Sequence, residues 1–174
     1  MESYRVPGPH QSVAQPPATP RPAVYVDGSW RQEVQRMGAA AVFRDAAGTW
    51  LSGISLGVDG GDAFIAELAG IELGLQQAWN LGHRELSCYS DCLEAVNVCT
   101  SHVDVTTYWA RDAILRIRTM LQWGWNVELT HVPRGKNNAA DCLAKHASRE
   151  GAARREWRLP PSFVIEALLK DVVA

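Results

Sequence analysis

The sequence lacks the features that define several large classes of protein. No stretch approaches the ~20 apolar residues of a membrane span, and Met1 to Arg21 has no apolar run like that of a signal peptide. The four cysteines form no C-x-x-C pair, which argues against a disulfide framework or a cysteine-based zinc site. Seventeen Lys and Arg against nineteen Asp and Glu give a net charge of -2, so bulk positive charge cannot hold a polyanion. We expect a cytoplasmic or nuclear protein that is not secreted and does not bind membranes.

Proline is scarce in the middle of the chain and concentrated at its start. Only Pro133 occurs between Ala23 and Ser148. This distribution predicts a disordered, proline-rich leader at 1–22, one folded domain at 23–148, and a basic linker with a C-terminal helix at 149–174. We expect Ser162 to cap that helix. One apolar face of the helix should dock on the core, and it consists of Ile165, Leu168, Leu169 and Val172.

Hydrophobic periodicity in the domain predicts an α/β fold with the element order β-β-β-α-β-α-α-β-α. The predicted strands are Ala23 to Asp27, Gly38 to Arg44, Thr49 to Leu56, Glu85 to Ser90 and Trp125 to His131. The predicted helices run from a cap at Asp62 to Asn80, from Cys92 to Ser101, from Thr107 to Trp123, and onward from a cap at Asn137 or Asn138. This order implies a mixed five-stranded sheet with helices on both faces. Three tryptophans are expected in the core rather than on a stacking surface: Trp109, Trp123 and Trp125.

Four acidic residues stand at the ends of predicted elements. Asp27 closes the first strand, and Asp91 closes the fourth. If these strands are parallel neighbours, both carboxylates emerge at one edge of the sheet. Glu67 lies about one turn into the first helix, and Asp141 falls in the first turn of the last. Each residue alone also fits a structural role, as a turn residue, a solvated helix residue or a helix cap.

A cluster of four carboxylates has a direct chemical use. Such groups cannot all stay ionised unaided, because mutual repulsion raises their pKa values. A divalent cation removes this conflict, and Mg²⁺ prefers oxygen ligands. Two Mg²⁺ ions about 4 Å apart can activate water on one side of a phosphodiester and stabilise the leaving oxygen on the other. The pattern therefore indicates two Mg²⁺ ions, for which Mn²⁺ is the expected substitute.

Four segments closely resemble the successive motifs of the type 1 ribonuclease H family, and the plant retroelement-type ribonuclease H-like domains most of all. The segments are V-Y-V-D-G-S-W, A-F-I-A-E-L-A-G-I-E-L-G-L, C-Y-S-D-C-L-E-A-V and H-V-P-R-G-K-N-N-A-A-D-C-L-A-K. The resemblance covers about Val24 to Ser148 and implies a ribonuclease H-like fold. The tail P-P-S-F-V-I-E-A-L-L is also similar to the end of those plant proteins.

The resemblance implies a metal-dependent endonuclease that hydrolyses the RNA strand of RNA/DNA hybrids and leaves 5'-phosphate and 3'-hydroxyl ends. The carboxylates that match the family's metal-binding catalytic residues are Asp27, Glu67, Asp91 and Asp141. We expect a monomer whose partner is the hybrid. The alternative is a catalytically weak or inactive, retroelement-derived module that binds nucleic acid without using its carboxylates.

Further residues are candidates for contacts with the substrate. Arg134 matches the arginine near the active site of family members that lack a histidine loop, and a guanidinium binds phosphate through two hydrogen bonds. Gly28 and Ser29 are expected to form the turn that exposes Asp27, with backbone amides available to a phosphate. Asn137 either contacts the substrate or caps the last helix. His131 keeps the period of its strand, which favours a structural position over the role of the family's mobile loop histidine.

Overall fold

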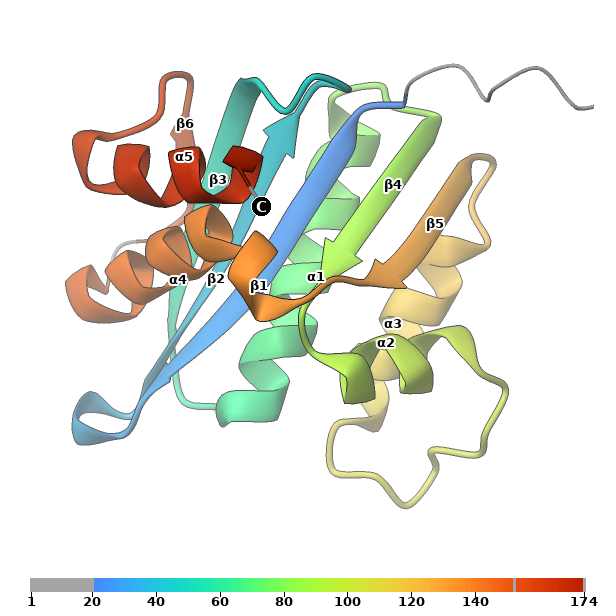
Figure 1. Ribbon diagram of the computed structural model, residues 1–174. Helices are drawn as coiled ribbons and strands as arrows, with labels where there is room; N and C mark the ends of the chain where they lie inside the picture. Colours follow the sequence, from blue (N-terminus) through green and yellow to red (C-terminus); the bar gives the residue numbers. More distant parts are fainter. Residues whose placement is uncertain (1–20, 152, 174) are drawn as a thin grey trace, which may run out of the picture.

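Six strands form one mixed sheet in the computed structural model, which describes residues 21–151 and 153–173. The spatial order is β5-β4-β1-β2-β3-β6 (Figure 1). The strands are β1 Ala23–Arg31, β2 Arg36–Arg44, β3 Trp50–Asp59, β4 Glu85–Ser90, β5 Asn126–His131 and β6 Arg155–Trp157. The helices are α1 Ala63–Asn80, α2 Leu93–Thr100, α3 Arg111–Leu121, α4 Asn138–Glu150 and α5 Ile165–Val173. The predicted leader at 1–22 lies, apart from its last two residues, outside the described residues.

The pairing of the strands changes from antiparallel to parallel where the connections change from hairpins to crossovers. β1, β2 and β3 are successive antiparallel neighbours, whereas β4 pairs with β1, and β5 with β4, in parallel. Helix α1 makes the first crossover and begins where predicted, since Asp62 accepts a hydrogen bond from the Ile65 amide at 2.8 Å. An N-cap of this kind satisfies one of the free amides at the start of a helix.

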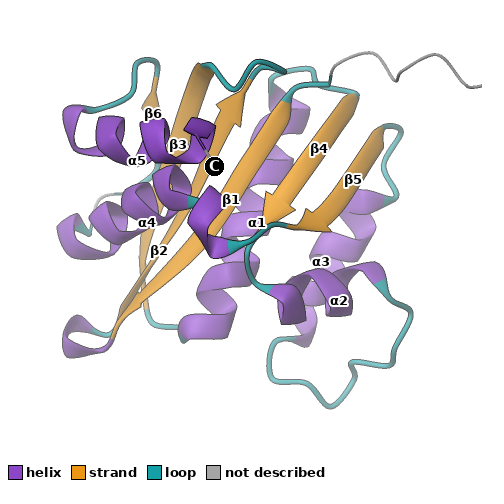
Figure 2. Cartoon of the chain, in the orientation of Figure 1, coloured by secondary structure: helices purple, strands orange, loops and turns teal. Residues whose placement is uncertain are grey.

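Helices cover both faces of the sheet, as predicted (Figure 2). Helices α1, α2 and α3 lie on one face and enclose the larger apolar core, which includes Leu68, Ile71 and Ile114. Helices α4 and α5 lie on the other face over a smaller core around Val42, Leu143 and Val164. Within the part of the chain that the structure describes, no helix combines the length and the apolarity needed to cross a membrane.

The prediction of five strands was one short, because the basic segment after α4 adds an edge strand. β6 pairs antiparallel with β3, and Trp157 donates a hydrogen bond to the Ser55 hydroxyl at 3.0 Å. Three residues are too few to show a strand periodicity in a sequence. The stretch predicted as a linker is therefore part of the sheet.

Helix α3 begins at Arg111, four residues later than predicted. The preceding residues form a turn in which Tyr108 and Trp109 stack, and Trp109 donates a hydrogen bond to Asp62 at 2.9 Å. Trp109 is 65% exposed, so its predicted place in the core was wrong. Trp123 and Trp125 do pack, edge to face, against Trp79.

Helix α5 docks on the core with a different face from the one predicted. It follows a 3-10 turn at Ser162–Val164, so it starts three residues beyond the expected cap. Leu168 packs on the core, whereas Ile165, Leu169 and Val172 are exposed. The inward face also carries Asp171, whose side chain is only 2% exposed because it pairs with Arg44. A buried ionic contact thus sets the rotation of this helix.

Candidate metal centre

The register of β1 and β4 brings Asp27 and Asp91 together. The last parallel pair is Val26 with Ser90, so both aspartates occupy the next position of their chains. β4 ends there, as predicted, but β1 continues to Arg31, and Asp27 pairs with Ala40 of β2. Asp27 therefore lies in the middle of a rigid strand and is 4% exposed.

Glu67 reaches the same place because α1 lies unusually close to β1. A Cβ on Gly28 would lie 2.1 Å from the Ala66 carbonyl, and one on Gly70 would lie 2.4 Å from the Asp27 carbonyl oxygen. Real Cβ atoms do not approach main chain so closely, so both positions require glycine. The two glycines allow the first turns of α1 to carry Glu67 to Asp27.

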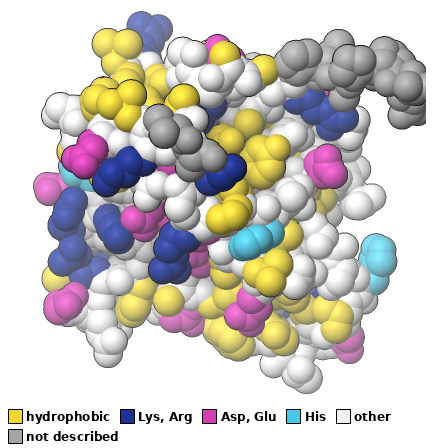
Figure 3. Space-filling view, in the orientation of Figure 1, with side chains coloured by type: hydrophobic (Ala, Val, Ile, Leu, Met, Phe, Trp, Pro, Cys, Tyr) yellow, Lys and Arg dark blue, Asp and Glu magenta, His cyan; other side chains and the backbone are white. Residues whose placement is uncertain are grey.

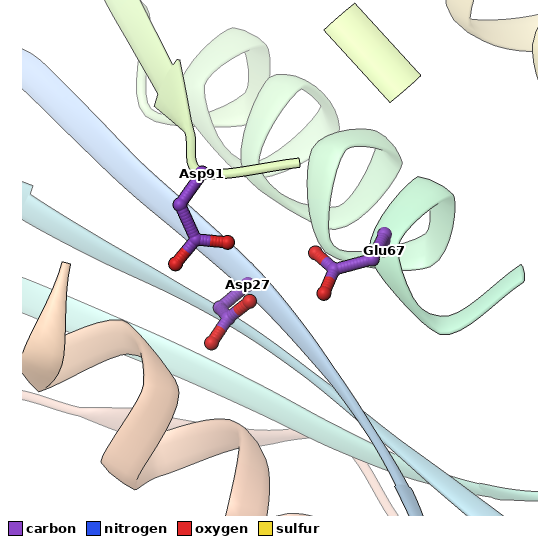
Figure 4. Close-up of side chains that lie close together, drawn as sticks. All are labelled: Asp27, Glu67 and Asp91. Carbon is purple, nitrogen blue, oxygen red and sulfur yellow. The ribbon is translucent and has the colours of Figure 1, made fainter. Parts of the chain in front are cut away.

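The three carboxylates of Asp27, Glu67 and Asp91 form one cluster (Figure 4). An oxygen from each lies within 4.8 Å of the others. Burial, and then the charges of Glu67 and Asp91, raise the pKa of Asp27 to about 10. Burial and the charge of Asp91 raise the pKa of Glu67 to about 7. Without a counter-charge the cluster therefore holds protons at neutral pH.

A hard divalent cation fits this cluster. The donors are all carboxylate oxygens on rigid elements, which suits Mg²⁺ or Mn²⁺. The buried Glu67 Oε2 has no hydrogen-bond partner among the described residues, which leaves one more oxygen for a ligand. A bound cation would remove the mutual repulsion that raises the two pKa values.

The fourth predicted carboxylate, Asp141, borders the cluster at Asp27 and lies within hydrogen-bonding reach of that side chain. It stands in the first turn of α4, and its charge adds to the forces that raise the pKa of Asp27, after burial, Glu67 and Asp91. Its carboxylate forms an ion pair with Lys145 at 2.9 Å. The structure thus places three of the four predicted ligands within 4.8 Å of one another, with Asp141 next to Asp27.

Asn137 does not cap α4 with its side chain, which was one of the two roles predicted for it. It is the N-cap residue of α4, yet its side chain makes no capping hydrogen bond, and it is fully buried. Its Nδ2 donates to the Val26 carbonyl at 2.9 Å and to Asp91 Oδ2 at 3.4 Å. Asn137 therefore ties the Asp91 carboxylate to strand β1. Spacing along the chain could not reveal this contact, because the partners are 111 and 46 residues away.

The turn predicted at Gly28 and Ser29 was also wrong. Both residues continue β1 and pair with Ala39 and Gly38 of β2. Gly28 serves the packing of α1, and the Ser29 hydroxyl lies 3.3 Å from the Ser148 hydroxyl. A Gly-Ser pair after a strand usually indicates a turn, but here close helix packing is the reason for the glycine.

Two exposed side chains border the cluster from the segment before α4. Arg134, in a 3-10 turn, is exposed. Burial raises the pKa of Asp91, and the charges of Arg134 and His131 oppose that rise, so both lie near this carboxylate. His131 is exposed although its period in β5 favoured a structural position, because the strand ends there beside Asp91.

Solved structures of ribonucleases H share this fold. The N-terminal RNase H domain of a Mycobacterium tuberculosis protein matches with a TM-score of 0.68 and 22% identity, over 76% of this chain and 96% of that one. RNase H1 of Halobacterium salinarum gives a TM-score of 0.68 and 23% identity, over 76% and 99%. LC11-RNase H1, solved with an RNA/DNA hybrid, gives 0.66 and 21%, over 75% and 99%. At these identities the likeness shows the fold alone.

The chain therefore has a ribonuclease H-like fold, with a cluster of three carboxylates in it. The sequence pattern of the family described as reverse transcriptase-like matches residues 25–147, and the chain belongs to this family. An Arabidopsis thaliana protein named after ribonuclease H is 29% identical over 156 residues, which are 86% of this chain and 24% of that protein. The chain thus spans about a quarter of the length of that relative.

Proposed function

We propose that this protein is a metal-dependent endonuclease that hydrolyses the RNA strand of RNA/DNA hybrids. The observation that carries the proposal is the cluster of Asp27 on β1, Glu67 on α1 and Asp91 directly after β4, with an oxygen from each within 4.8 Å of the others. Rigid elements hold ligands with the precision that phosphodiester hydrolysis needs. A hybrid in one solved structure of the same fold supports the substrate class.

Asp27, Glu67 and Asp91 would hold Mg²⁺, with Asp141 at the edge of the site. When bound, two such ions activate the attacking water and stabilise the leaving oxygen. Asp141 pairs with Lys145 through Oδ2, so a second ion could be held through its other carboxylate oxygen.

The surface beside the cluster supplies positive charge for a nucleic-acid backbone. Arg134 is exposed next to the carboxylates, and Lys145 and Arg149 project from α4. Figure 3 shows Lys and Arg side chains gathered over this helix. We propose that Arg134 contacts a substrate phosphate through its guanidinium. Asn137, which is buried, acts on Asp91 rather than on the substrate.

The test is cleavage of a hybrid whose RNA strand carries a fluorescent label, with Mg²⁺ and with Mn²⁺. The wild-type protein should cut the RNA strand and leave single-stranded DNA intact. Asp91→Asn should abolish cutting while the hybrid still binds. If the wild-type protein binds the hybrid but cleaves it with neither Mg²⁺ nor Mn²⁺, the proposal is overturned in favour of a binding module that does not use its carboxylates.

A further inference from the structure

The first turn of α4 receives its cap from another helix. The first amides of a helix have no partner within the helix and need one elsewhere. Asn137 stands at the N-cap, but only its Nδ2 is bonded, to Val26 and Asp91, and its buried Oδ1, the atom that could cap the helix, has no partner among the described residues. Asp171 of α5 supplies the cap instead. Its Oδ1 accepts from the Asn138 amide at 2.8 Å, and its Oδ2 accepts from the Ala139 amide at 2.9 Å.

Several contacts hold Asp171 in this position. The same carboxylate accepts from the Asn138 side chain at 3.0 Å and lies 3.7 Å from Arg44 Nη1. Arg44 also donates to the carbonyl oxygens of Gly48 and Leu168, which links β2 to the hairpin turn and to α5. With Arg44 4% and Asp171 2% exposed at their side chains, this is a buried network.

We propose that Asp171 is a positioning residue for the metal centre. Asparagine is one of the best N-cap residues, and an N-cap side chain bonds to the amide two or three positions on, which here is that of Ala139 or Ala140. Asp171 already occupies the Ala139 amide. By capping α4 from outside, it leaves the Asn137 side chain to hold Asp91 against β1.

The consequence is that α5, which carries Asp171, is needed to keep the Asp91 carboxylate in place. The hydrogen bonds and the ion pair of Asp171 go to the start of α4 and to Arg44 rather than to the carboxylate cluster, so it acts on Asp91 through Asn137. Removing the Asp171 carboxylate frees the Ala139 amide, and the Asn137 side chain can then turn away from Asp91 to cap its own helix. Only the last step, from Asp91 to the metal, rests on the proposed function.

The test compares Asp171→Ala and Asp171→Asn with two matched controls in the full chain. Ile54→Val removes a buried methylene far from α5 and lowers stability without touching the network. Glu166→Ala removes an exposed carboxylate from the same helix. One readout is hydrogen exchange of the Asn137 side-chain amide by NMR, and the other is the dissociation constant for Mn²⁺.

Asp171→Ala should speed exchange of the Asn137 amide at least about 10-fold and weaken Mn²⁺ binding about 3- to 10-fold, which is less than the roughly 10- to 100-fold cost of losing a residue that contacts a metal ligand directly. Asp171→Asn, which keeps one acceptor oxygen, should fall between, and the controls should match wild type in both readouts. Adding Asn137→Ala to Asp171→Ala should weaken Mn²⁺ binding no further.

If Asp171→Ala lowers only the melting temperature, as Ile54→Val does, Asp171 is a structural residue and the inference is wrong. If the wild-type protein binds no Mn²⁺, the proposed function fails. In that case the exchange of the Asn137 amide still decides whether Asp171 frees that side chain.

Discussion

Gly70 of α1 lies against the main chain of Asp27, so closely that a Cβ on Gly70 would sit 2.4 Å from the Asp27 carbonyl oxygen. This approach is what brings Glu67, one turn earlier in the helix, into the carboxylate cluster. The close packing of α1 on β1 therefore also places Glu67 in the site.

Gly70→Ala should destabilise the protein by about 1 to 3 kcal/mol, because the added methyl overpacks the contact with β1. It should also lower cleavage activity by displacing Glu67. The matched control is Gly124→Ala, where a Cβ meets nothing within 4 Å of the described atoms. That variant should change stability by less than about 1 kcal/mol. Chemical denaturation measures the free energy of unfolding of each variant, and equal values for the two would show that Gly70 is not needed for close packing.

Asp27→Asn should separate stability from function. Asp27, with a pKa of about 10, must take up a proton when the metal-free protein folds at pH 8, whereas asparagine needs none, so the variant should be more stable by at least about 1 to 2 kcal/mol, since one pKa unit corresponds to about 1.4 kcal/mol. The same change should lower cleavage by about two orders of magnitude or more, because a metal ligand is lost. Asp112→Asn, at an exposed carboxylate, should leave both unchanged. If Asp27→Asn is less stable than the wild-type protein, the pKa of Asp27 is not raised by the cluster as described.

The metal-free protein should lose stability as the pH rises through the neutral range. The pKa of Glu67 is raised from 4.5 to about 7, so the folded state keeps a proton that the unfolded chain releases. Stability is therefore highest below about pH 4.5 for this group and declines towards pH 7, by about 1 to 3 kcal/mol. Asp27, with a pKa of about 10, extends the decline to higher pH.

Because Mg²⁺ binds the ionised cluster, the rise in melting temperature on adding Mg²⁺ should be larger at pH 8 than at pH 5.5. Differential scanning fluorimetry with and without Mg²⁺ measures this difference. An increment that does not depend on pH would mean that the cation binds elsewhere.

Arg134→Ala should weaken binding of the hybrid about 3- to 10-fold and reduce the slope of log affinity against log salt by about 1, the value for one phosphate contact. Arg134→Lys should restore the slope but only part of the affinity, since an ammonium binds phosphate as a point charge. Lys170→Ala removes an exposed charge on α5 and should change neither. Fluorescence anisotropy in the Asp91→Asn background measures binding without cleavage, and an unchanged slope would remove Arg134 from the interface.

Local patterns predicted much of the fold and of the cluster. Asp62 as the cap of α1, and Asp91 at the end of β4, follow from the alternation and capping rules that act over a few residues. Three of the four predicted carboxylates, Asp27, Glu67 and Asp91, do lie together. The family resemblance supplied the order of the motifs, and the match to residues 25–147 confirms it.

The features that sequence could not reveal depend on contacts between distant segments. β6 is only three residues long and is defined by its pairing with β3. The inward face of α5 is set by Asp171 and Arg44, a polar pair that a hydrophobic pattern hides. Asn137 has the position of a local cap, but its partners are Val26 and Asp91, and the cap comes from Asp171, which lies 33 residues beyond Asn138.

The central claim is that Asp27, Glu67 and Asp91 share a divalent cation. The most direct measurement is anomalous diffraction from crystals of the protein grown with Mn²⁺, compared with crystals of the Asp27→Asn variant. An anomalous peak should lie among the three carboxylates of the wild-type protein and be absent from the variant. Saturating Mn²⁺ with no peak between these side chains would contradict it.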